Sequence, residues 1–151
     1  MDRLRSDGIT SLATLVDDGL PELAAGRRIL YLGSRARFAG RIGPSDDGRY
    51  GPGLYLTSLG RARRLPAAYP GVIFACDVTD LSLLALDSPE AYRRRLEGLR
   101  GGRRIPDALA RLLLQAMLLA KGYDGVQVVD DAETEALVFP SQVRLLRLAP
   151  V

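Results

Sequence analysis

Seven short apolar runs along the 151-residue chain predict β-strands. Each run is four to seven residues long and mostly aliphatic, and turn-forming residues separate the runs, which is the pattern of buried strands. The runs cover residues 28–32, 54–57, 72–78, 81–86, 125–129, 136–139 and 143–148. Residues 39–53 are rich in Gly, Pro, Asp, Ser and Arg and predict a long loop, and loops of this length in compact domains are often functional.

Capping signals predict three shorter helices. Serine and threonine are favoured at the start of a helix because the side-chain oxygen accepts a hydrogen bond from a free backbone N–H. Ser58 precedes a basic helix that ends by Pro66, and Ser88 with Pro89 begins a helix over residues 90–99. Near the N-terminus, Thr10 and Ser11 predict a helix with one apolar face, made of Leu12, Leu15 and Val16.

A fourth, longer helix follows Pro106 and ends at Gly122. Apolar residues recur along it with helical period and form one stripe, which we interpret as part of the core. The stripe consists of Leu109, Leu112, Leu113, Ala116, Met117 and Ala120.

Strands and helices are mixed along the chain without regular strand-helix alternation. This order predicts an α+β domain with a largely antiparallel sheet. The length and the 47% hydrophobic content fit one compact domain over residues 1–151, with residues 1–27 as an N-terminal helical extension. No Gly-x-Gly-x-x-Gly motif follows a predicted strand and no P-loop motif is present, so neither type of nucleotide site is expected.

Histidine is absent, and Cys76 is the single cysteine. A Ser-His-Asp triad, a Cys-His pair and a histidine-ligated metal are therefore excluded, and no metal site is expected. Cys76 lies in an apolar run and is interpreted as a buried structural thiol in a reducing compartment. Any catalysis has to use carboxylates, tyrosines and arginines.

The net charge is +3, and all 21 basic residues are arginines except Lys121. This charge is small for a nucleic-acid-binding module, and no aromatic-interleaved basic motif accompanies it. The N-terminus is charged where a signal peptide needs an apolar core, and the apolar runs are shorter than the about 20 residues that span a bilayer. We expect no membrane partner and a cytoplasmic location, or delivery to a target-cell cytoplasm without a cleavable signal peptide.

Four motifs occur in order between residues 28 and 148. They are Tyr31-Leu32-Gly33-Ser34, Gly53-Leu54-Tyr55-Leu56-Thr57-Ser58, Gly122-Tyr123-Asp124-Gly125-Val126 and Glu135-Ala136-Leu137-Val138-Phe139-Pro140-Ser141-Gln142-Val143. Together they resemble the mono-ADP-ribosyltransferase family. The resemblance implies a split, mostly antiparallel β core with flanking helices, which holds NAD as substrate in a cleft between its halves.

The resemblance also implies a biological role. Small stand-alone domains of this family are commonly bacterial toxins or effectors that transfer ADP-ribose to a macromolecular acceptor. We expect this acceptor to be a protein rather than a nucleic acid. Toxins of this kind in toxin-antitoxin systems have an immunity or antitoxin protein as a further partner.

Two glutamates and a tyrosine are the predicted catalytic residues. Cleavage of the nicotinamide-ribose bond generates an oxocarbenium-like cation, which a carboxylate held beneath the sugar stabilises. The resemblance gives this role to Glu135, which would also hold a ribose hydroxyl. Glu133 points to the same side of an extended segment, and the Glu-x-Glu pair resembles arginine-modifying transferases, in which the first glutamate engages the acceptor. Tyr55 would offer an aromatic face to the nicotinamide ring.

The other motif residues are predicted to bind NAD. Gly33 fits a backbone contact to the carboxamide, because glycine permits close approach. Tyr69 would provide a second aromatic face, and Thr57 and Ser58 would position the glutamate. The full predicted binding set is Tyr31, Leu32, Gly33, Ser34, Arg49, Gly53, Thr57, Ser58 and Tyr69.

Leu32 departs from the family pattern. The two main groups of the family place a histidine or an arginine there to grip the adenosine ribose or the phosphates of NAD, and leucine can do neither. A guanidinium group matches phosphate bidentately, so an arginine from a neighbouring position is expected to supply the contact. The candidates are Arg28, Arg35, Arg37 and Arg49.

Structural interpretations stand beside these roles. Tyr55 fits an ordinary core residue of a strand, and Glu133 and Glu135 fit an acidic turn after Asp130 and Asp131. Tyr69 is also typical of a turn, and Ser58 of a plain helix cap.

Two other functions stay open. RES-domain toxins share a related fold and consume NAD by hydrolysis or phosphorolysis. Their arginine and serine would be sought in Arg28 or Arg49 and in Ser141, although no glutamate follows Ser58 before Asp77. The third possibility is an inactive scaffold that binds a partner through the cleft or through the basic helix at residues 61–64.

Overall fold

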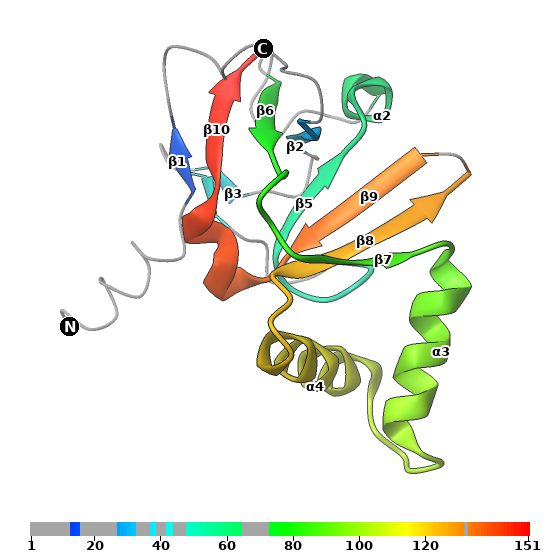
Figure 1. Cartoon of the computed structure of the whole chain (residues 1–151). Coiled ribbons are helices and arrows are strands. Elements are labelled where there is room, and N and C mark those ends of the chain that lie inside the picture. The colour runs from blue at the N-terminus through cyan, green and yellow to red at the C-terminus, as the bar shows by residue number, and fades with distance from the viewer. Residues whose placement is uncertain are drawn as a thin grey trace, which may run out of the picture.

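The computed structural model describes residues 13–15, 27–32, 37–38, 42–43, 48–64, 73–131 and 133–151. Within these residues eight strands form one sheet in the order β1-β10-β6-β2-β5-β9-β8-β7, and β3 pairs with β4 separately. The pairs β1–β10 and β7–β8 are parallel, and the other neighbours in the large sheet are antiparallel. The domain is therefore α+β with a mostly antiparallel sheet, as the element order predicts (Figure 1).

Most of the predicted elements are confirmed, within a few residues at their ends. The helices are α2 (Leu59–Arg64), α3 (Pro89–Arg100), α4 (Asp107–Ala120) and the 3₁₀ helix η1 (Pro140–Leu145). The strands are β1 (Thr14–Leu15), β2 (Ile29–Leu32), β3 (Arg37–Phe38), β4 (Ile42–Gly43), β5 (Leu54–Thr57), β6 (Phe74–Asp77), β7 (Leu83–Leu86), β8 (Gly125–Asp130), β9 (Glu133–Val138) and β10 (Arg147–Pro150).

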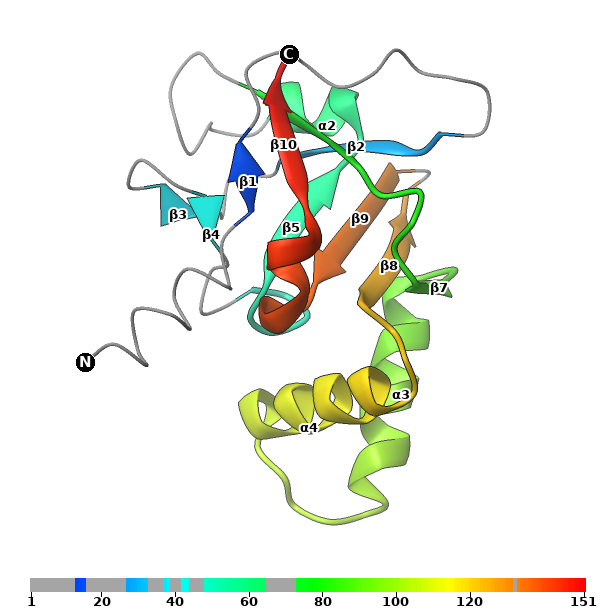
Figure 2. The ribbon, with the colours of Figure 1, turned by 60° about the vertical axis from the view of Figure 1, so that its left-hand side comes forward.

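Two hydrophobic cores lie on opposite faces of the sheet. The first includes Leu56, Cys76 and Leu148 and extends to Val143 on η1. The second includes Tyr55 and Val128 and packs against α3 and α4. Successive side chains of a strand point to opposite faces, so β5 contributes to both cores. Figures 1 and 2 show α3 and α4 together at one end of the molecule, beyond the ends of β7, β8 and β9.

Cys76 is fully buried in the first core, as predicted. Burial raises the pKa of its thiol to about 12. Since the thiolate is the reactive form of cysteine, the side chain is a packing residue here.

The segment around Thr14 is a strand and not the predicted helix. Thr14 and Leu15 pair in parallel register with Arg147 and Leu148 of β10, and the Thr14 N–H donates to the carbonyl of Leu146 at 2.9 Å. The hydrogen bonds offered by β10 outweigh the local helix signal. The rest of the predicted N-terminal helix lies outside the described residues.

The predicted strand over residues 143–148 is largely wrong. Pro140 begins η1, and the strand β10 starts only at Arg147. Val143 and Leu146 are both buried against the first core, and their spacing of three residues is helical. An apolar run this short does not distinguish a strand from a helical turn.

The predicted core stripe of α4 is exposed. The four largest members are between 40% and 49% exposed. They are Leu109 (47%), Leu112 (49%), Leu113 (40%) and Met117 (44%). The helix instead buries the side that carries Ala110, Leu114, Gln115 and Leu118. The Gln115 side-chain amide donates to the carbonyl of Pro52 at 2.8 Å. This hydrogen bond satisfies a polar group that burial would otherwise penalise, so the more polar side of α4 can face inward.

Candidate functional site

Three strands bring residues from separate motifs into one row. Tyr31 of β2 is in register with Thr57 of β5, and Thr57 is in register with Glu135 of β9. Directly opposite residues of paired strands share a sheet face, with Cβ atoms about 4.5–5.5 Å apart. Tyr31, Thr57 and Glu135 therefore stand side by side on the face of the second core, and we call them the Glu135 row.

Glu135 is a largely buried carboxylate with a cationic partner. Its side chain is 15% exposed, and a guanidinium nitrogen of Arg61 on α2 lies 3.7 Å from its Oε2 atom. A buried carboxylate costs free energy unless an opposite charge or hydrogen bonds compensate for the lost water. Arg61 supplies that compensation, so the row contains an acid that is shielded from bulk solvent but not enclosed.

Two further carboxylates flank Glu135. Glu133 forms an ion pair with Arg64 of α2. Asp130, in register with Glu133 across the β8–β9 pair, accepts a hydrogen bond from Arg49 at 2.7 Å. This hydrogen bond raises the pKa of Arg49. We call Asp130, Glu133, Arg49 and Arg64 the charged rim, because each acid in it is held by an arginine from another element.

Thr57 and Ser58 position the groups around Glu135. The buried Thr57 hydroxyl donates to the backbone carbonyl of Thr134 at 2.9 Å and so holds the residue directly before Glu135. The Ser58 hydroxyl accepts from the backbone N–H of Arg61 at 3.4 Å, which confirms its predicted role as the cap of α2. The start of α2 is thereby fixed where Arg61 reaches Glu135.

The structure places Tyr55 in the core and not on an open surface. Its side chain is 5% exposed, its hydroxyl donates to the carbonyl of Gly51 at 2.6 Å, and it accepts from the N–H of Tyr50 at 2.9 Å. Burial raises the pKa of Tyr55. A Cβ on Gly48 would lie 2.3 Å from the Tyr55 hydroxyl. The ring therefore secures the 48–51 loop, as the structural interpretation expects, and has no open face for nicotinamide.

Gly53 and Leu32 also have structural positions. A Cβ on Gly53 would lie 2.4 Å from the carbonyl oxygen of Val138, and its φ of +152° lies in the range that favours glycine. Leu32 is in register with Leu56 and packs against the first core, so its side chain points away from the Glu135 row. The close approach of β5 and β9 therefore explains why residue 53 is glycine. Packing against the first core explains why residue 32 is leucine.

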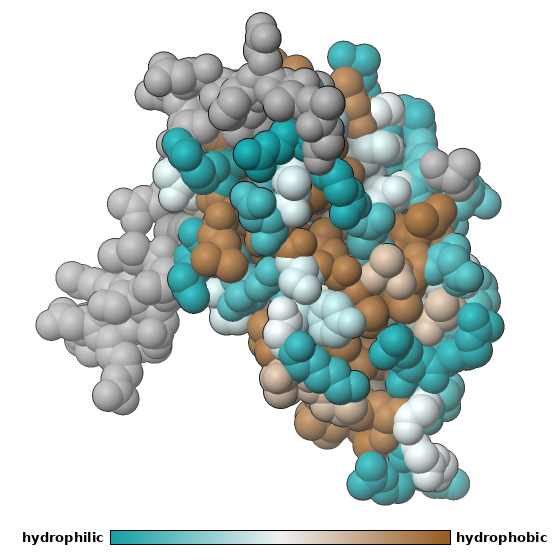
Figure 3. All heavy atoms as spheres, in the orientation of Figure 1, coloured by the Kyte–Doolittle hydropathy of each residue, from teal (hydrophilic) through white to brown (hydrophobic). Residues whose placement is uncertain are grey.

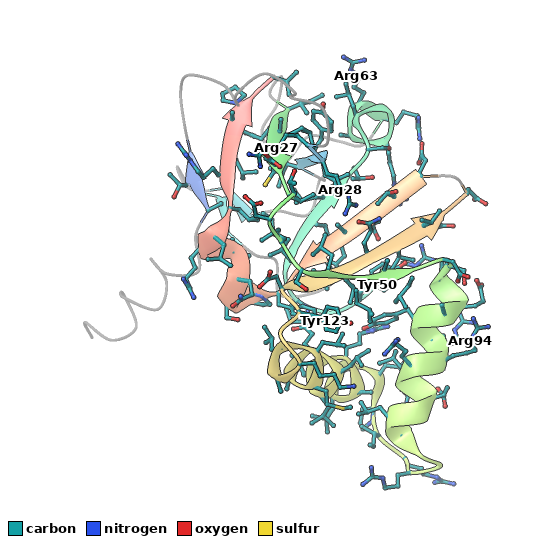
Figure 4. The ribbon with its side chains drawn as sticks, in the orientation of Figure 1. Arg27, Arg28, Tyr50, Arg63, Arg94 and Tyr123 are labelled. Atoms are coloured by element: carbon teal, nitrogen blue, oxygen red, sulfur yellow. The ribbon has the colours of Figure 1, made fainter. Side chains whose placement is uncertain are left out.

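Two of the arginines considered as replacements for Leu32 are described with their side chains. Arg28 bonds the side chain of Gln127, which is in register with Ala136 and so lies on the face opposite Glu135. Arg49 belongs to the charged rim, on the same face as Glu135. Of these two arginines, Arg49 is the one on the side of the Glu135 row. Figure 4 shows Arg28 beside the upper strands. It also labels Tyr50, the residue after Arg49, which lies between the sheet and α3.

Several predicted residues lie outside the described part of the chain. These are Gly33, Ser34, Tyr69 and Arg35, and the side chain of Arg37 is likewise not described. Ser141, sought for the RES-type site, lies on η1 beyond the far end of β9 from Glu135 and donates to the side chain of Gln142 at 3.2 Å. The structure therefore does not bring Ser141 to the Glu135 row.

A pocket adjoins the charged rim. It has a volume of about 310 Å³ and lies between α3, α4 and the loop that precedes β5. Its lining includes Arg49, Tyr50, Tyr92, Leu96, Arg100 and Arg111. Arg49 belongs to both the pocket and the rim, so a ligand in the pocket could contact Arg49.

Arg61 and Asp130 are site residues that the motifs did not identify. Arg61 belongs to a basic helix whose charges are typical of a solvated surface. The sequence indicates Arg61 only through its position, three residues after the capping Ser58. Side chains in the first turn of a helix lean toward its N-terminus, so Arg61 points back toward the preceding strand β5. Asp130 ends β8, and only its register with Glu133 reveals that it belongs to the site.

Within the described ranges, no group of three or more histidine, cysteine, aspartate or glutamate side chains is arranged to hold a metal ion. Likewise, none of the helices described has the length and apolar character needed to cross a bilayer.

No protein-family model matches the chain, and no curated protein matches its sequence. Among solved structures, the crystal structure of an anti-CRISPR protein matches 87% of this chain and 100% of its own length, with 17% sequence identity and a TM-score of 0.43. A similarity this low carries no conclusion about function.

Proposed function

We propose that this domain is an NAD-dependent mono-ADP-ribosyltransferase that acts as a toxin or effector on a macromolecular acceptor. The observation that carries the proposal is the Glu135 row. Three motifs that are far apart in the sequence supply neighbouring side chains on one sheet face. At the end of the row stands a carboxylate that is only 15% exposed and has a cationic partner.

The arrangement suits cleavage of the bond between ribose C1′ and the nicotinamide nitrogen. The bonding electron pair leaves with neutral nicotinamide, and positive charge develops on C1′ and the ring oxygen of the ribose. Glu135 stabilises this charge, which is larger in the transition state than in NAD and so lowers the barrier. The acceptor nucleophile then adds to C1′ and loses a proton.

Glu133 and two arginines have further proposed roles. Glu133 projects on the same face as Glu135 and engages an acceptor group such as a guanidinium. Arg61 and Arg49 bind the phosphates of NAD and replace the histidine or arginine that is missing at Leu32. Guanidinium groups bind phosphate with paired hydrogen bonds, and both arginines lie next to the row.

The test is NAD turnover by the purified chain and its Glu135→Gln variant. The substitution removes one charge and almost no volume, so we expect nicotinamide release to fall about 100-fold or more while the melting temperature stays unchanged. The matched control is Glu90→Gln, which removes the same charge from an exposed position at the start of α3. Equal turnover in Glu135→Gln and wild type would contradict the assignment of Glu135.

The fate of labelled ADP-ribose separates the alternatives. Label on an acceptor supports transfer, whereas release of nicotinamide without label on an acceptor supports NAD hydrolysis of the RES type. No release under any condition, together with measurable NAD binding, supports an inactive binding module.

A further inference from the structure

The exposed side of α4 is the most apolar helix surface among the described residues. It carries the stripe Leu109, Leu112, Leu113, Ala116, Met117 and Ala120, and all six residues are exposed. No charged residue occurs between Leu112 and Ala120. Figure 3 shows hydrophobic side chains gathered over α4 at the lower end of the molecule. We call these six residues the α4 stripe.

A helix that is apolar on both sides is normally covered on both sides. In this chain α3 and the sheet cover the side with Ala110, Leu114 and Leu118. Exposed contiguous apolar surface usually marks an interaction site, whereas single exposed apolar residues need no explanation. The α4 stripe is contiguous over three turns, so it has the character of an interaction surface.

We propose that the α4 stripe binds the same stripe of a second copy of this chain, with the two helices antiparallel around a two-fold axis. An axis level with the point between residues 114 and 115 places Leu109 opposite Ala120, Leu112 opposite Met117, and Leu113 opposite Ala116 of the other copy. Two of these layers combine a large and a small side chain, and the third combines leucine with the flexible Met117. Such alternation fills an interface without voids.

The opposite orientation fits less well. Parallel helices would place Ala116 against Ala116 and Ala120 against Ala120, which leaves gaps, and leucines against identical leucines. Antiparallel helices also align their dipoles favourably and bring the Lys121 end of one helix to the Asp107 end of the other. The interface is isologous, so it closes at two copies.

The charged residues of the chain lie outside this surface. The chain has 21 basic and 18 acidic residues, and none of them belongs to the α4 stripe. The stripe has no charge, and two copies can therefore meet there without like-charge repulsion.

Sedimentation velocity over about 1–100 µM, a range that covers micromolar dissociation constants, tests the proposal. We expect a concentration-dependent dimer. Leu112→Glu buries a carboxylate in the interface and should raise the dissociation constant about 100-fold or more. The matched control is Leu145→Glu, the same change at a leucine on η1 that is 45% exposed, and it should leave the dimer intact. Both leucines are exposed, so both variants should fold, and circular dichroism checks this.

Disulfide trapping tests the register. Leu113→Cys and Ala116→Cys proteins are prepared separately and mixed under mild oxidation, while the fully buried Cys76 stays in place. The antiparallel arrangement predicts that crosslinks join one variant to the other. Crosslinks that join Ala116→Cys copies to each other would overturn the register. A wild-type chain that stays monomeric, or a dimer unaffected by Leu112→Glu, would overturn the proposal. Neither experiment depends on NAD turnover.

Discussion

One face of the sheet has an apolar, fully buried region and a polar region. The two regions are only two residues apart along β5 and β9. Tyr55 and Leu137 lie in the second core beneath α3 and α4. The next residues on the same face of the same strands are Thr57 and Glu135, which belong to the Glu135 row. Tyr55 and Leu137, beneath the helices, are fully packed core residues. Glu135, two residues before Leu137 on β9, keeps 15% of its side chain exposed, so the covering helices decide which side chains of this face stay open to solvent.

The same contrast holds for the two sides of α4. The side that packs inward includes Arg111 and Gln115, and the side that faces outward is uniformly apolar. In a monomer this arrangement is unfavourable. It becomes favourable when a second copy covers the outward side.

The greatest loss of stability is expected on the covered side of α4. Leu118 is 2% exposed, and Leu118→Ala should lower the free energy of unfolding by about 3 kcal/mol because it leaves a cavity. Leu112 is 49% exposed, and Leu112→Ala should cost less than about 1 kcal/mol in dilute solution, where the chain is monomeric. Urea unfolding measures both. Similar losses for the two leucines would contradict the orientation of α4.

A medium effect is expected at the junction of the two regions, where Tyr50 and Tyr55 lie. Tyr55→Phe should cost about 1–3 kcal/mol, because it leaves the Tyr50 N–H and the Gly51 carbonyl without their partner. Tyr50 is the control: its buried hydroxyl has no hydrogen-bond partner among the described residues. Tyr50→Phe should therefore change stability by less than about 1 kcal/mol, in the stabilising direction. Thermal unfolding of both variants tests these expectations. A Tyr50→Phe variant that loses more than about 1 kcal/mol of stability would show that this hydroxyl has a partner.

The smallest effect is expected from a charged group, Asp77 at the end of β6. Burial alone raises the pKa of Asp77, but hydrogen bonds from the Thr79 hydroxyl and N–H, with the nearby Arg27, bring it below its ordinary value. A lowered folded pKa contributes stability above the unfolded pKa of about 3.9 and loses it as the pH falls through the folded value.

Asp77→Asn should therefore be slightly less stable than wild type near neutral pH. The difference should shrink at a pH below the folded pKa of Asp77. Melting temperatures of the two proteins across this range check the sign. A difference that grew on acidification would contradict it.

Part of the candidate site was accessible from the sequence. The glutamates of β9 and Thr57 of β5 were identified from short motifs and lie in one place in the structure. The same motif predicts a catalytic role for Tyr55, yet its ring is buried because the 48–51 loop folds over it. A motif indicates which residues are near each other, whereas exposure depends on a loop that the motif does not contain. Arg61 and Asp130 were missed because their importance depends on cross-strand neighbours.

The α+β class, most of the strands and helices, and the absence of histidine and of an intrachain disulfide can be predicted from the amino-acid sequence alone. These properties follow from composition and from periodicity, which act over a few residues. The register of β2, β5 and β9, the burial of Tyr55 and the inward side of α4 become known only from the folded chain. The reason is that each depends on pairings between distant segments. On α4 both sides are apolar enough to pack, so the hydrogen bond from Gln115 to the distant Pro52 carbonyl, and not the local pattern, favours the side that is buried.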